Sequence, residues 1–491
     1  MNEARYYPFG GSFAHVIGYV AKVSDRDIKA IRDKGEDPPA LLYNPGFRIG
    51  RSGVEKSLDE DLRGEAGGTR VEVDARGRVV GEDVGGSRPA TAGSDVVLTL
   101  DADVQNRALE VFGEESGACV VMDIRNGDIL CMVSAPSFPN LFVSGVPSNI
   151  YNALRDYERK PLLDKAIGGV FHPGSTFKLT TALALLEAGV DPKERVVCTG
   201  GYRFGNRTFR CWKHDGHGPQ DMHDAIKNSC DVYFYHLCNR AGVDGINETA
   251  RKIGFMQTYD LGVGNQREGT IPSRAWKAHY NRNNPDPSTR TWYPGETLSV
   301  AIGQGDVNVT ALQLAVMVSR FANARKALQP RLIKSIGGVE QKSGAEVPDL
   351  PFSRAHLEVV RQGMVAVAND VSGGAYRQSQ LGLGDIQMAG KTGTAQVRSY
   401  DNVNRKSSSV GWALKDHNLF VAFAPIDEPR YGVAVIVEHG GLAGSTADLV
   451  DSDVVEGAAP PDPQDLAPAP ARRPAAPTAT SGPRPYLSEP R

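Results

Sequence analysis

The chain contains no long hydrophobic run. None of its 491 residues lies in a stretch approaching the roughly 18 uninterrupted apolar residues that a membrane-spanning helix needs. Residues 1–10 are polar and aromatic, without the apolar core of a signal peptide. A marked excess of one charge is also lacking, since the net charge is −3, so nothing indicates a nucleic-acid partner. What remains is an ordinary globular composition, 40% hydrophobic and 23% charged, in a chain long enough for two or three domains.

Three regions differ in composition. Residues 1–95 are rich in glycine and charge, and short alternating runs such as Thr69–Asp74 predict a small β-rich module. Residues 96–455 carry the apolar periodicity of a larger domain. From residue 456 the chain is rich in proline, alanine and arginine, and 10 of its 31 prolines follow Ala459. Such a stretch cannot bury enough apolar surface to offset its ordering entropy, so a disordered tail is predicted over 456–491.

The larger domain is predicted to be an α+β domain. Strands at both of its ends surround a mostly helical middle, which indicates one antiparallel sheet flanked by helices. The strands are expected at residues 118–124, 129–133, 419–424 and 431–437, and the clearest helices at residues 179–188 and 310–324. Asn126-Gly127 between the first two strands predicts a type I′ hairpin turn.

Ser175 and Lys178 form the first chemical motif, in the run 171–178. Three positions place both side chains on one helix face, and a desolvated lysine can remove the proton of a serine hydroxyl. A pair of this kind arises by chance roughly twice in a chain of this length and average composition. By itself it describes a helix-capping serine and a solvated lysine equally well.

Two further motifs follow in order. Ser229-Cys230-Asp231 offers a second hydroxyl and a carboxylate for proton transfer, and Lys391-Thr392-Gly393-Thr394 offers a cation and strand N–H groups. We expect Gly393 to leave room for a substrate against the strand. Alone, each tripeptide or tetrapeptide describes an ordinary loop or strand end. The ordered set of three is typical of penicillin-interacting acyltransferases.

With these motifs in place, the chain resembles the class B penicillin-binding proteins, and among them the elongation transpeptidases. The resemblance runs from about residue 5 to about residue 445. It rests on the three motifs and on residues 8–19, 50–55, 302–305, 310–315 and 389–395. It implies a penicillin-binding transpeptidase domain at residues 96–455, preceded by a partial pedestal (dimerisation-like) domain at residues 1–95.

The resemblance also implies the activity, which is cross-linking of peptidoglycan stem peptides during cell-wall elongation and rod-shape maintenance, with covalent trapping by β-lactams. Ser175 would be the nucleophile and Lys178 its base, while Ser229 and Asp231 would help to move the proton. Lys391 would act in the site with Thr392, Gly393 and Thr394, which would hold the substrate carboxylate. Backbone N–H groups of Ser175 and Thr394 would form the oxyanion hole.

The implied setting is the inner membrane, with the enzyme facing the periplasm beside a SEDS-family glycosyltransferase and other elongation-complex proteins. The sequence departs from the family in three places. Asp231 stands where asparagine is commoner, the membrane anchor and first part of the pedestal are missing, and residues 445–453 run acidic where a final helix is expected. We therefore expect a chain truncated at its N-terminus, with a reading-frame change near Ala443.

The chain contains six cysteines, which fall into two groups. The hairpin turn predicts that Cys131 pairs with Met122 and that Cys119 lies on the opposite face, both as core residues. Three others, with one histidine, fit a closed tetrahedral structural zinc site. That set is Cys198, Cys211, His217 and Cys230, with His214, His223 or Cys238 as possible substitutes. The alternatives are a Cys198–Cys211 disulfide or unlinked buried thiols. Some elongation-type relatives carry metal ligands at corresponding places, with aspartate at two of them.

Other functions share parts of this pattern. A serine β-lactamase or a D-Ala-D-Ala carboxypeptidase uses the first and third motifs, but no deacylating glutamate motif is apparent. A β-lactam sensor or a non-catalytic scaffold remains a further alternative, although every motif residue is present.

Overall fold

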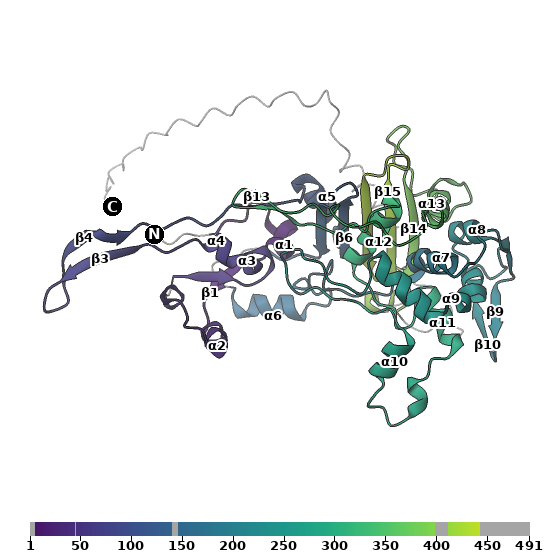
Figure 1. Cartoon of the computed structure of the whole chain (residues 1–491), viewed down its shortest axis with the longest axis horizontal. Coiled ribbons are helices and arrows are strands. Elements are labelled where there is room, and N and C mark those ends of the chain that lie inside the picture. The colour runs from purple at the N-terminus through teal and green to yellow at the C-terminus, as the bar shows by residue number, and fades with distance from the viewer. Residues whose placement is uncertain (1–4, 45, 140–145, 398–410, 442–491) are drawn as a thin grey trace, which may run out of the picture. The chain divides into compact units, whose positions relative to one another are not determined.

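The computed structural model describes residues 5–44, 46–139, 146–397 and 411–441 (Figure 1). The predicted disordered tail and the predicted reading-frame change lie outside the described residues. The described residues belong to one compact unit, and the domain boundary near residue 95 stays a prediction. Within the described residues, no helix combines the length and the apolar character needed to cross a bilayer.

The N-terminal module combines short helices with two pairs of strands. β1 pairs with β2, and β3 pairs with β4 as a hairpin. Most of the helices are only four or five residues long, too short to show a 3.6-residue period, so the sequence pattern predicted only strands. The elements are η1 (Gly10–Phe13), α1 (Ala14–Ile17), β1 (Val20–Lys22), α2 (Asp25–Asp33), η2 (Ala40–Tyr43), β2 (Arg48–Gly50), α3 (Gly53–Ser57), α4 (Asp59–Arg63), β3 (Gly68–Val73) and β4 (Val79–Arg88).

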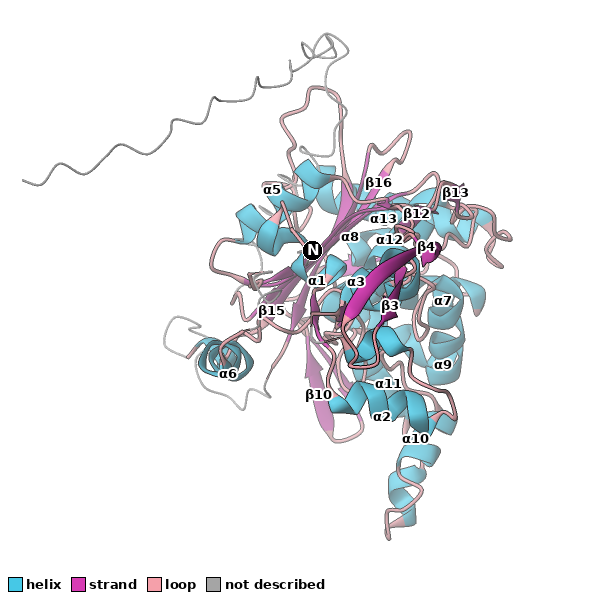
Figure 2. Ribbon diagram, turned by 90° about the vertical axis from the view of Figure 1, so that its left-hand side faces the viewer, coloured by secondary structure: helices cyan, strands magenta, loops and turns pink. Residues whose placement is uncertain are grey.

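A five-stranded antiparallel sheet organises the larger domain. Its order is β14-β15-β16-β6-β7, so strands from both ends of the domain lie side by side, as the sequence predicted. The strands are β6 (Ser116–Asp123), β7 (Ile129–Ala135), β14 (Ala389–Ala395), β15 (His417–Ala424) and β16 (Tyr431–Glu438). Nearly every residue of these strands is buried, because helices cover both faces (Figure 2).

Helices pack on both faces of this sheet. Helix α5 lies against β6 and β7, while α12 crosses β6, β15 and β16 on the other face and α13 lies against β14. The helices are α5 (Ala102–Phe112), α6 (Ser148–Asp156), η4 (Gly174–Phe177), α7 (Lys178–Glu187), α8 (Met222–Lys227), α9 (Asp231–Ile253), α10 (Arg274–Tyr280), η5 (Pro287–Arg290), α11 (Pro294–Ala301), α12 (Ala311–Asn323), α13 (Arg354–Asn369) and η7 (Trp412–Leu414). The predicted helices over 179–188 and 310–324 are confirmed as α7 and α12.

Short strands accompany the helical part. They are β5 (Val96–Leu98), β8 (Val196–Cys198), β9 (Gly201–Phe204), β10 (Arg207–Arg210), β11 (Gly218–Gln220), β12 (Ile333–Ile336) and β13 (Val339–Glu340). β8 pairs with β11 and β9 pairs with β10, which folds the 196–220 segment back on itself just before the second motif.

The turn between β6 and β7 differs from the type I′ turn predicted. Gly127 has φ +83°, whereas Asn126 is not among the residues of positive φ. The Gly127 N–H donates to Asp123 O, which makes a longer loop closed by a left-handed glycine. A register shift after Val121 then pairs Val121 with Cys131 and Cys119 with Val133.

The predicted pairing of Cys131 with Met122 is therefore wrong. Because directly paired residues share a face, Cys119 and Cys131 lie on the same face of the sheet, not on opposite faces. Both are fully buried, as expected of core residues.

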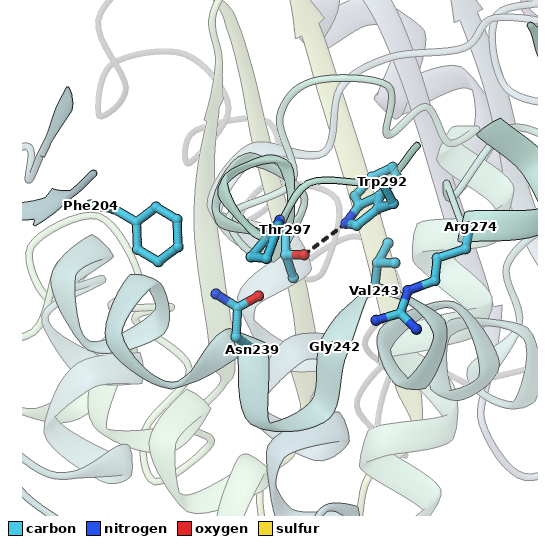
Figure 3. Close-up of a pocket in the computed structure, with 8 residues that line it drawn as sticks. Phe204, Asn239, Gly242, Val243, Arg274, Trp292 and Thr297 are labelled. Atoms are coloured by element: carbon cyan, nitrogen blue, oxygen red, sulfur yellow. Dashed lines mark hydrogen bonds between the residues drawn. The ribbon is translucent and has the colours of Figure 1, made fainter. Parts of the chain in front are cut away.

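Helix α9 is interrupted at Gly242, where φ is +66° and ψ is 169°. The interruption lies beside a pocket of about 350 Å³ between α9, the start of α10, the end of β9 and the start of α11 (Figure 3). Phe204 and Trp292 supply aromatic rings to this pocket, and Asn239 and Arg274 supply polar groups.

Two glycines in helices provide a matched test of packing. In α13, a Cβ at Gly363 would lie 2.8 Å from Cβ and Cγ2 of Ile226 on α8, the helix that precedes the second motif. In α9, a Cβ at Gly245 would meet only Ala241 Cβ, at 3.7 Å.

We therefore expect Gly363→Ala to lower the free energy of unfolding by about 1–3 kcal/mol through overpacking, despite the higher helix propensity of alanine. The control Gly245→Ala should raise it by up to about 1 kcal/mol. Urea denaturation of both variants measures this, and a stabilised Gly363→Ala variant would show that α13 and α8 pack less closely than described.

Candidate active site

The first and third motifs meet through their backbones. Ser175 lies in η4, which leads directly into α7, and a Cβ at Gly174 would lie 2.3 Å from Thr394 O on β14. Gly174 has φ +52°, so both its conformation and its contact require glycine. The predicted position of Ser175 at the start of a helix is confirmed, and the edge strand β14 lies against it.

Lys178 connects the first motif to the second. Its side chain is fully buried, and its Nζ donates to Asp231 Oδ1 at 2.7 Å and to Ser229 O at 2.8 Å. A longer contact, 3.3 Å, joins the same Nζ to Ser229 Oγ. Burial raises the pKa of Asp231, while the adjacent Lys178 ammonium opposes that rise. A buried carboxylate and a buried ammonium thus hold α7 and the start of α9 together.

Lys391 connects the third motif to the hydroxyl of Ser229. This residue of β14 is also fully buried, and its Nζ donates to Ser229 Oγ at 3.0 Å and to Thr392 O at 3.0 Å. Desolvation, and next the nearby Lys178 ammonium, lower the pKa of Lys391 to about 7. Two lysines from distant parts of the chain therefore share one serine hydroxyl, which is the arrangement that a proton relay needs.

Ser175 itself is half-buried. Among the described residues, no hydrogen bond is found on its hydroxyl, and Lys178 donates to Ser229 and Asp231 instead. Thr392 and Thr394 are also half-buried and alternate along β14 with the buried Lys391 and Gly393. A Cβ at Gly393 would lie 2.8 Å from Pro173 O and 2.9 Å from Thr176 Cγ2. Glycine is therefore required here by the approach of η4, and the expected clearance for a substrate stays a prediction.

Trp212 is a site residue that sequence reasoning missed. Its backbone N–H donates to Asp231 Oδ2 at 3.0 Å, and its indole Nε1 donates to Ser229 O at 3.1 Å. Ser229 has φ +51°, a conformation that is costly for a residue with a Cβ. Trp212 is 53% exposed and thus forms part of the site's surface. Its only signal in the sequence is that it follows Cys211.

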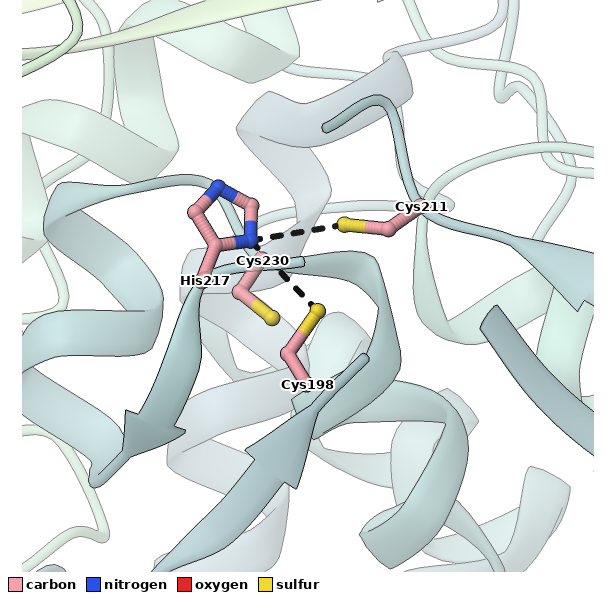
Figure 4. Close-up of side chains that lie close together, drawn as sticks. All are labelled: Cys198, Cys211, His217 and Cys230. Carbon is pink, nitrogen blue, oxygen red and sulfur yellow. Dashed lines mark hydrogen bonds between the residues drawn. The ribbon is translucent and has the colours of Figure 1, made fainter. Parts of the chain in front are cut away.

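The predicted cysteine and histidine cluster is assembled around the same loop (Figure 4). Cys198 ends β8, Cys211 follows β10, His217 precedes β11 and Cys230 caps α9. One ligand atom from each lies within 4.8 Å of all the others. Nδ1 of His217 is 3.6 Å from the Sγ atoms of both Cys198 and Cys211. Zn–S and Zn–N bonds of usual length in a tetrahedron separate sulfur and nitrogen by about 3.6 Å, so the donor set fits zinc.

The substitute ligands do not join this cluster. His214 and His223 are exposed, and Cys238 is buried in α9, where its thiol contacts Tyr235 O. Cys198, Cys211 and Cys230 are free thiols, so the alternative Cys198–Cys211 disulfide is not formed. Hydrogen bonding from Cys230 lowers the pKa of the Cys211 thiol, and His217 adds to this effect. Trp212 stacks edge-on against His217, with ring centroids 5.2 Å apart, so the cluster and the catalytic motifs are in contact through one side chain.

The depressed pKa of Lys391 has a consequence for stability. Between about pH 7 and pH 10.5 the unfolded chain carries a proton on Lys391 that the folded chain has released. Stability of the native chain therefore increases with pH across this window, and the full penalty of the buried ammonium applies below pH 7.

We expect Lys391→Met to be more stable than the native chain at pH 6. The difference should shrink by up to about 1.4 kcal/mol per pH unit as the pH rises from 7 towards 10. Denaturation at several pH values measures it, with Lys193→Met, an exposed lysine, as the control. A difference that does not vary with pH would contradict the assigned burial of the Lys391 charge.

Two sequence families match the chain. The pattern of the penicillin binding protein transpeptidase domain matches residues 117–454, and that of the penicillin-binding protein dimerisation domain matches residues 1–98. The peptidoglycan D,D-transpeptidase MrdA of Acinetobacter baumannii is 38% identical over 454 residues, covering 91% of this chain and 64% of that protein. The chain thus spans slightly less than two thirds of this relative's length.

Solved structures agree with these matches. The crystal structure of Pseudomonas aeruginosa PBP2 in complex with WCK 5153 is 33% identical, with a TM-score of 0.75, covering 92% of this chain and 89% of that one. The complex between PBP2 and MreC from Helicobacter pylori is 28% identical, with a TM-score of 0.78, covering 92% and 78%. Both domains are matched, and the three motifs lie together at one site. The chain therefore belongs to the penicillin-binding proteins, and within that family it is similar to PBP2 transpeptidases.

Proposed function

We propose that this protein is a peptidoglycan D,D-transpeptidase that cross-links stem peptides during cell-wall elongation and so maintains rod shape. The observation that carries the proposal is the meeting of Lys178 and Lys391 at the hydroxyl of Ser229, beside the turn that holds Ser175. Similarity to the transpeptidase MrdA supports the same substrate class.

In the acylation step, Ser175 Oγ attacks the carbonyl carbon of the penultimate D-Ala, and the bond to the terminal D-Ala nitrogen breaks. The serine proton passes to Lys178, and the Ser229 hydroxyl then hands its own proton to the leaving amine while taking one from Lys178. Backbone N–H groups of Ser175 and Thr394 would stabilise the oxyanion, while Lys391, Thr392 and Thr394 would hold the substrate carboxylate. Gly393 would serve by letting η4 approach β14.

In the transfer step, an amine of a neighbouring stem peptide attacks the ester carbonyl. The bond to Ser175 Oγ breaks, a cross-link forms, and the amine proton returns along the same groups to Ser175. A β-lactam carries an amide of similar shape, so its acyl-serine ester would persist because its leaving group stays attached.

We further propose that the protein works at the inner membrane on the periplasmic side, with a SEDS-family glycosyltransferase and other elongation-complex proteins. The support is the family resemblance and the Helicobacter pylori complex, which shows a PBP2 assembled with MreC.

The cluster of Cys198, Cys211, His217 and Cys230 is proposed to hold a structural zinc ion. A bound zinc would supply a cross-link among four segments, without a part in the chemistry. Cys230 lies between Ser229 and Asp231 in the second motif, and Cys211 precedes Trp212, which contacts that motif. A cross-link through these two cysteines would therefore restrain the second motif at two points. The metal would therefore stabilise the left-handed conformation of Ser229.

Intact mass after incubation with benzylpenicillin tests the proposed function. We expect one adduct of the full drug mass on the native chain, none on Ser175→Ala, and an unchanged adduct on the exposed control Ser372→Ala. Rapid nitrocefin hydrolysis without a lasting adduct would instead identify a β-lactamase. A folded chain that forms no adduct would favour a scaffold.

Elemental analysis tests the metal. We expect one zinc per purified chain, loss of zinc in Cys211→Ser, and its retention in the core control Cys131→Ser. Removal by a chelator should change the fluorescence of Trp212, which contacts His217, and slow acylation by penicillin. Unchanged penicillin labelling after demonstrated zinc removal would contradict the coupling between the cluster and the second motif.

A further inference from the structure

Residues 274–293, from the start of α10 to Tyr293, form a segment that we call the α10 finger (Figure 1). Four of its residues are aromatic, namely Trp276, Tyr280, Trp292 and Tyr293, and they include two of the chain's four tryptophans. Its charge is also unusual for a chain of net charge −3, with four basic side chains and one acidic one. These are Arg274, Lys277, Arg282, Arg290 and Asp286.

Two of these aromatic rings, those of Tyr280 and Tyr293, are exposed, whereas Trp276 and Trp292 are half-buried. Tyr280 is 70% exposed and stacks on Trp276 with ring centroids 5.1 Å apart and planes 16° from parallel. Lys277 lies 5.5 Å from the ring centres of both Trp292 and Tyr293. Rings fixed in this way lose little entropy when a ligand packs on them, so they are suited to binding more than to filling a core.

Backbone and side-chain hydrogen bonds hold the finger in shape. Asn281 donates to Lys277 O and to Thr289 O, each at 3.1 Å, and Arg290 donates to Asn284 O at 2.9 Å. The turn is therefore supported by polar contacts. Trp292 packs against the core and donates to Thr297 Oγ1, whereas Tyr280 is 70% exposed. Exposed tyrosine, tryptophan and arginine together are the residues enriched at binding surfaces.

The finger continues into the 350 Å³ pocket beside α9 (Figure 3). Trp292 and Arg274 belong to both, and Phe204 supplies the opposite aromatic wall. Arg274 is 72% exposed and Asn239 is exposed. A guanidinium group and an amide group therefore line a largely apolar cavity. This volume, with few polar groups at an aromatic wall, is within the usual range of small-ligand sites.

The pocket is connected to the nucleophile by one helix. α11 begins at the pocket with Pro294 and ends at Ala301, a length of about 12 Å at the usual helical rise. Two residues later, a Cβ at Gly303 would lie 2.3 Å from Gly174 O, next to Ser175. A ligand in the pocket is therefore roughly one helix length from the reacting serine, near enough for both to contact one polymer.

We propose that the α10 finger and the adjoining pocket bind the glycan strand that carries the stem peptides. Sugar rings would pack on the exposed aromatic faces, and stem carboxylates would lie near the finger's excess of positive charge. This inference rests on the proposed function, and it adds a second contact with substrate outside the site of acylation. Lys277 forms an ion pair with Glu296, and Arg274 Nε lies 3.5 Å from Asp244 Oδ2. The positive charge offered to stem carboxylates therefore comes chiefly from Arg282 and Arg290, which have no carboxylate partner among the described residues.

Sedimentation with purified, insoluble peptidoglycan sacculi tests the proposal. The test variant is Arg274→Gln with Tyr280→Ser, both exposed side chains, in the Ser175→Ala background so that turnover does not contribute. The matched control is Arg78→Gln with Tyr6→Ser, which are exposed residues of the N-terminal module. Benzylpenicillin acylation of the same substitutions in the Ser175 background reports whether the site remains folded.

We expect the test variant to bind sacculi at least about fivefold more weakly, as for loss of interface hot spots, and the control to bind like the parent. Acylation by the small drug should be unchanged in both. Binding by the test variant equal to the parent would overturn the proposal, and is the result expected if the finger instead docks a protein. If the double variant lost acylation, Tyr280→Ser alone would be measured against Tyr6→Ser with the same criterion.

Sacculi whose stem carboxylates have been converted to amides separate the two parts of the interaction, because the cross-linked polymer stays insoluble. Their binding should lose the salt dependence that untreated sacculi show, while the effect of Tyr280→Ser persists. Salt dependence that survives amidation would contradict the role given to the stem carboxylates. Failure of the native chain to form a penicillin adduct would count against the proposed function, whereas sacculus binding by the Ser175→Ala chain is measured independently of it.

Discussion

Two buried lysine amines that meet at one serine hydroxyl are the constraint on which the rest of this structure depends. Lys178 and Lys391 come from α7 and β14, and among the described residues only Asp231 offers a carboxylate in direct contact with either. Such an arrangement is unfavourable in isolation, since each charge has lost its water. It persists because packing around it is rigid, with α13 held against both α8 and β14 and η4 held against β14. Burying these two lysines thus lowers the folding stability locally while placing reactive groups together, as at many functional sites.

The loop between α8 and α9 has an unfavourable backbone conformation, and a second set of contacts stabilises it. Ser229 has a left-handed conformation that its own side chain disfavours. Trp212 holds its carbonyl group, and the cysteine and histidine cluster holds Trp212 from the other side. The paired strands β8 and β11 and the hairpin β9–β10 would therefore act on the proposed reaction by positioning the second motif.

The sequence predicted this molecule best where a pattern is local. The hydrophobic strands, the helices α7 and α12 and the three ordered motifs were all found, and the four cluster residues lie together as their chemistry suggested. The hairpin register was missed, because a bulge at Val121 and a longer turn at Gly127 depend on packing around β6 and β7. The contact of Gly393 with η4 and the place of Trp212 in the site were not predicted, for a related reason. Both depend on which distant backbone comes close, and no local spacing encodes that.

The central claim is that the Ser229 hydroxyl connects the two lysines in the proton relay. The most direct measurement is the second-order rate constant for acylation of Ser229→Ala by benzylpenicillin, with the melting temperature as a check on folding. The account predicts that the rate falls by about 10²-fold or more, the usual contribution of positioned proton transfer, in a chain that remains folded. A folded Ser229→Ala chain that acylates at nearly the native rate would contradict it.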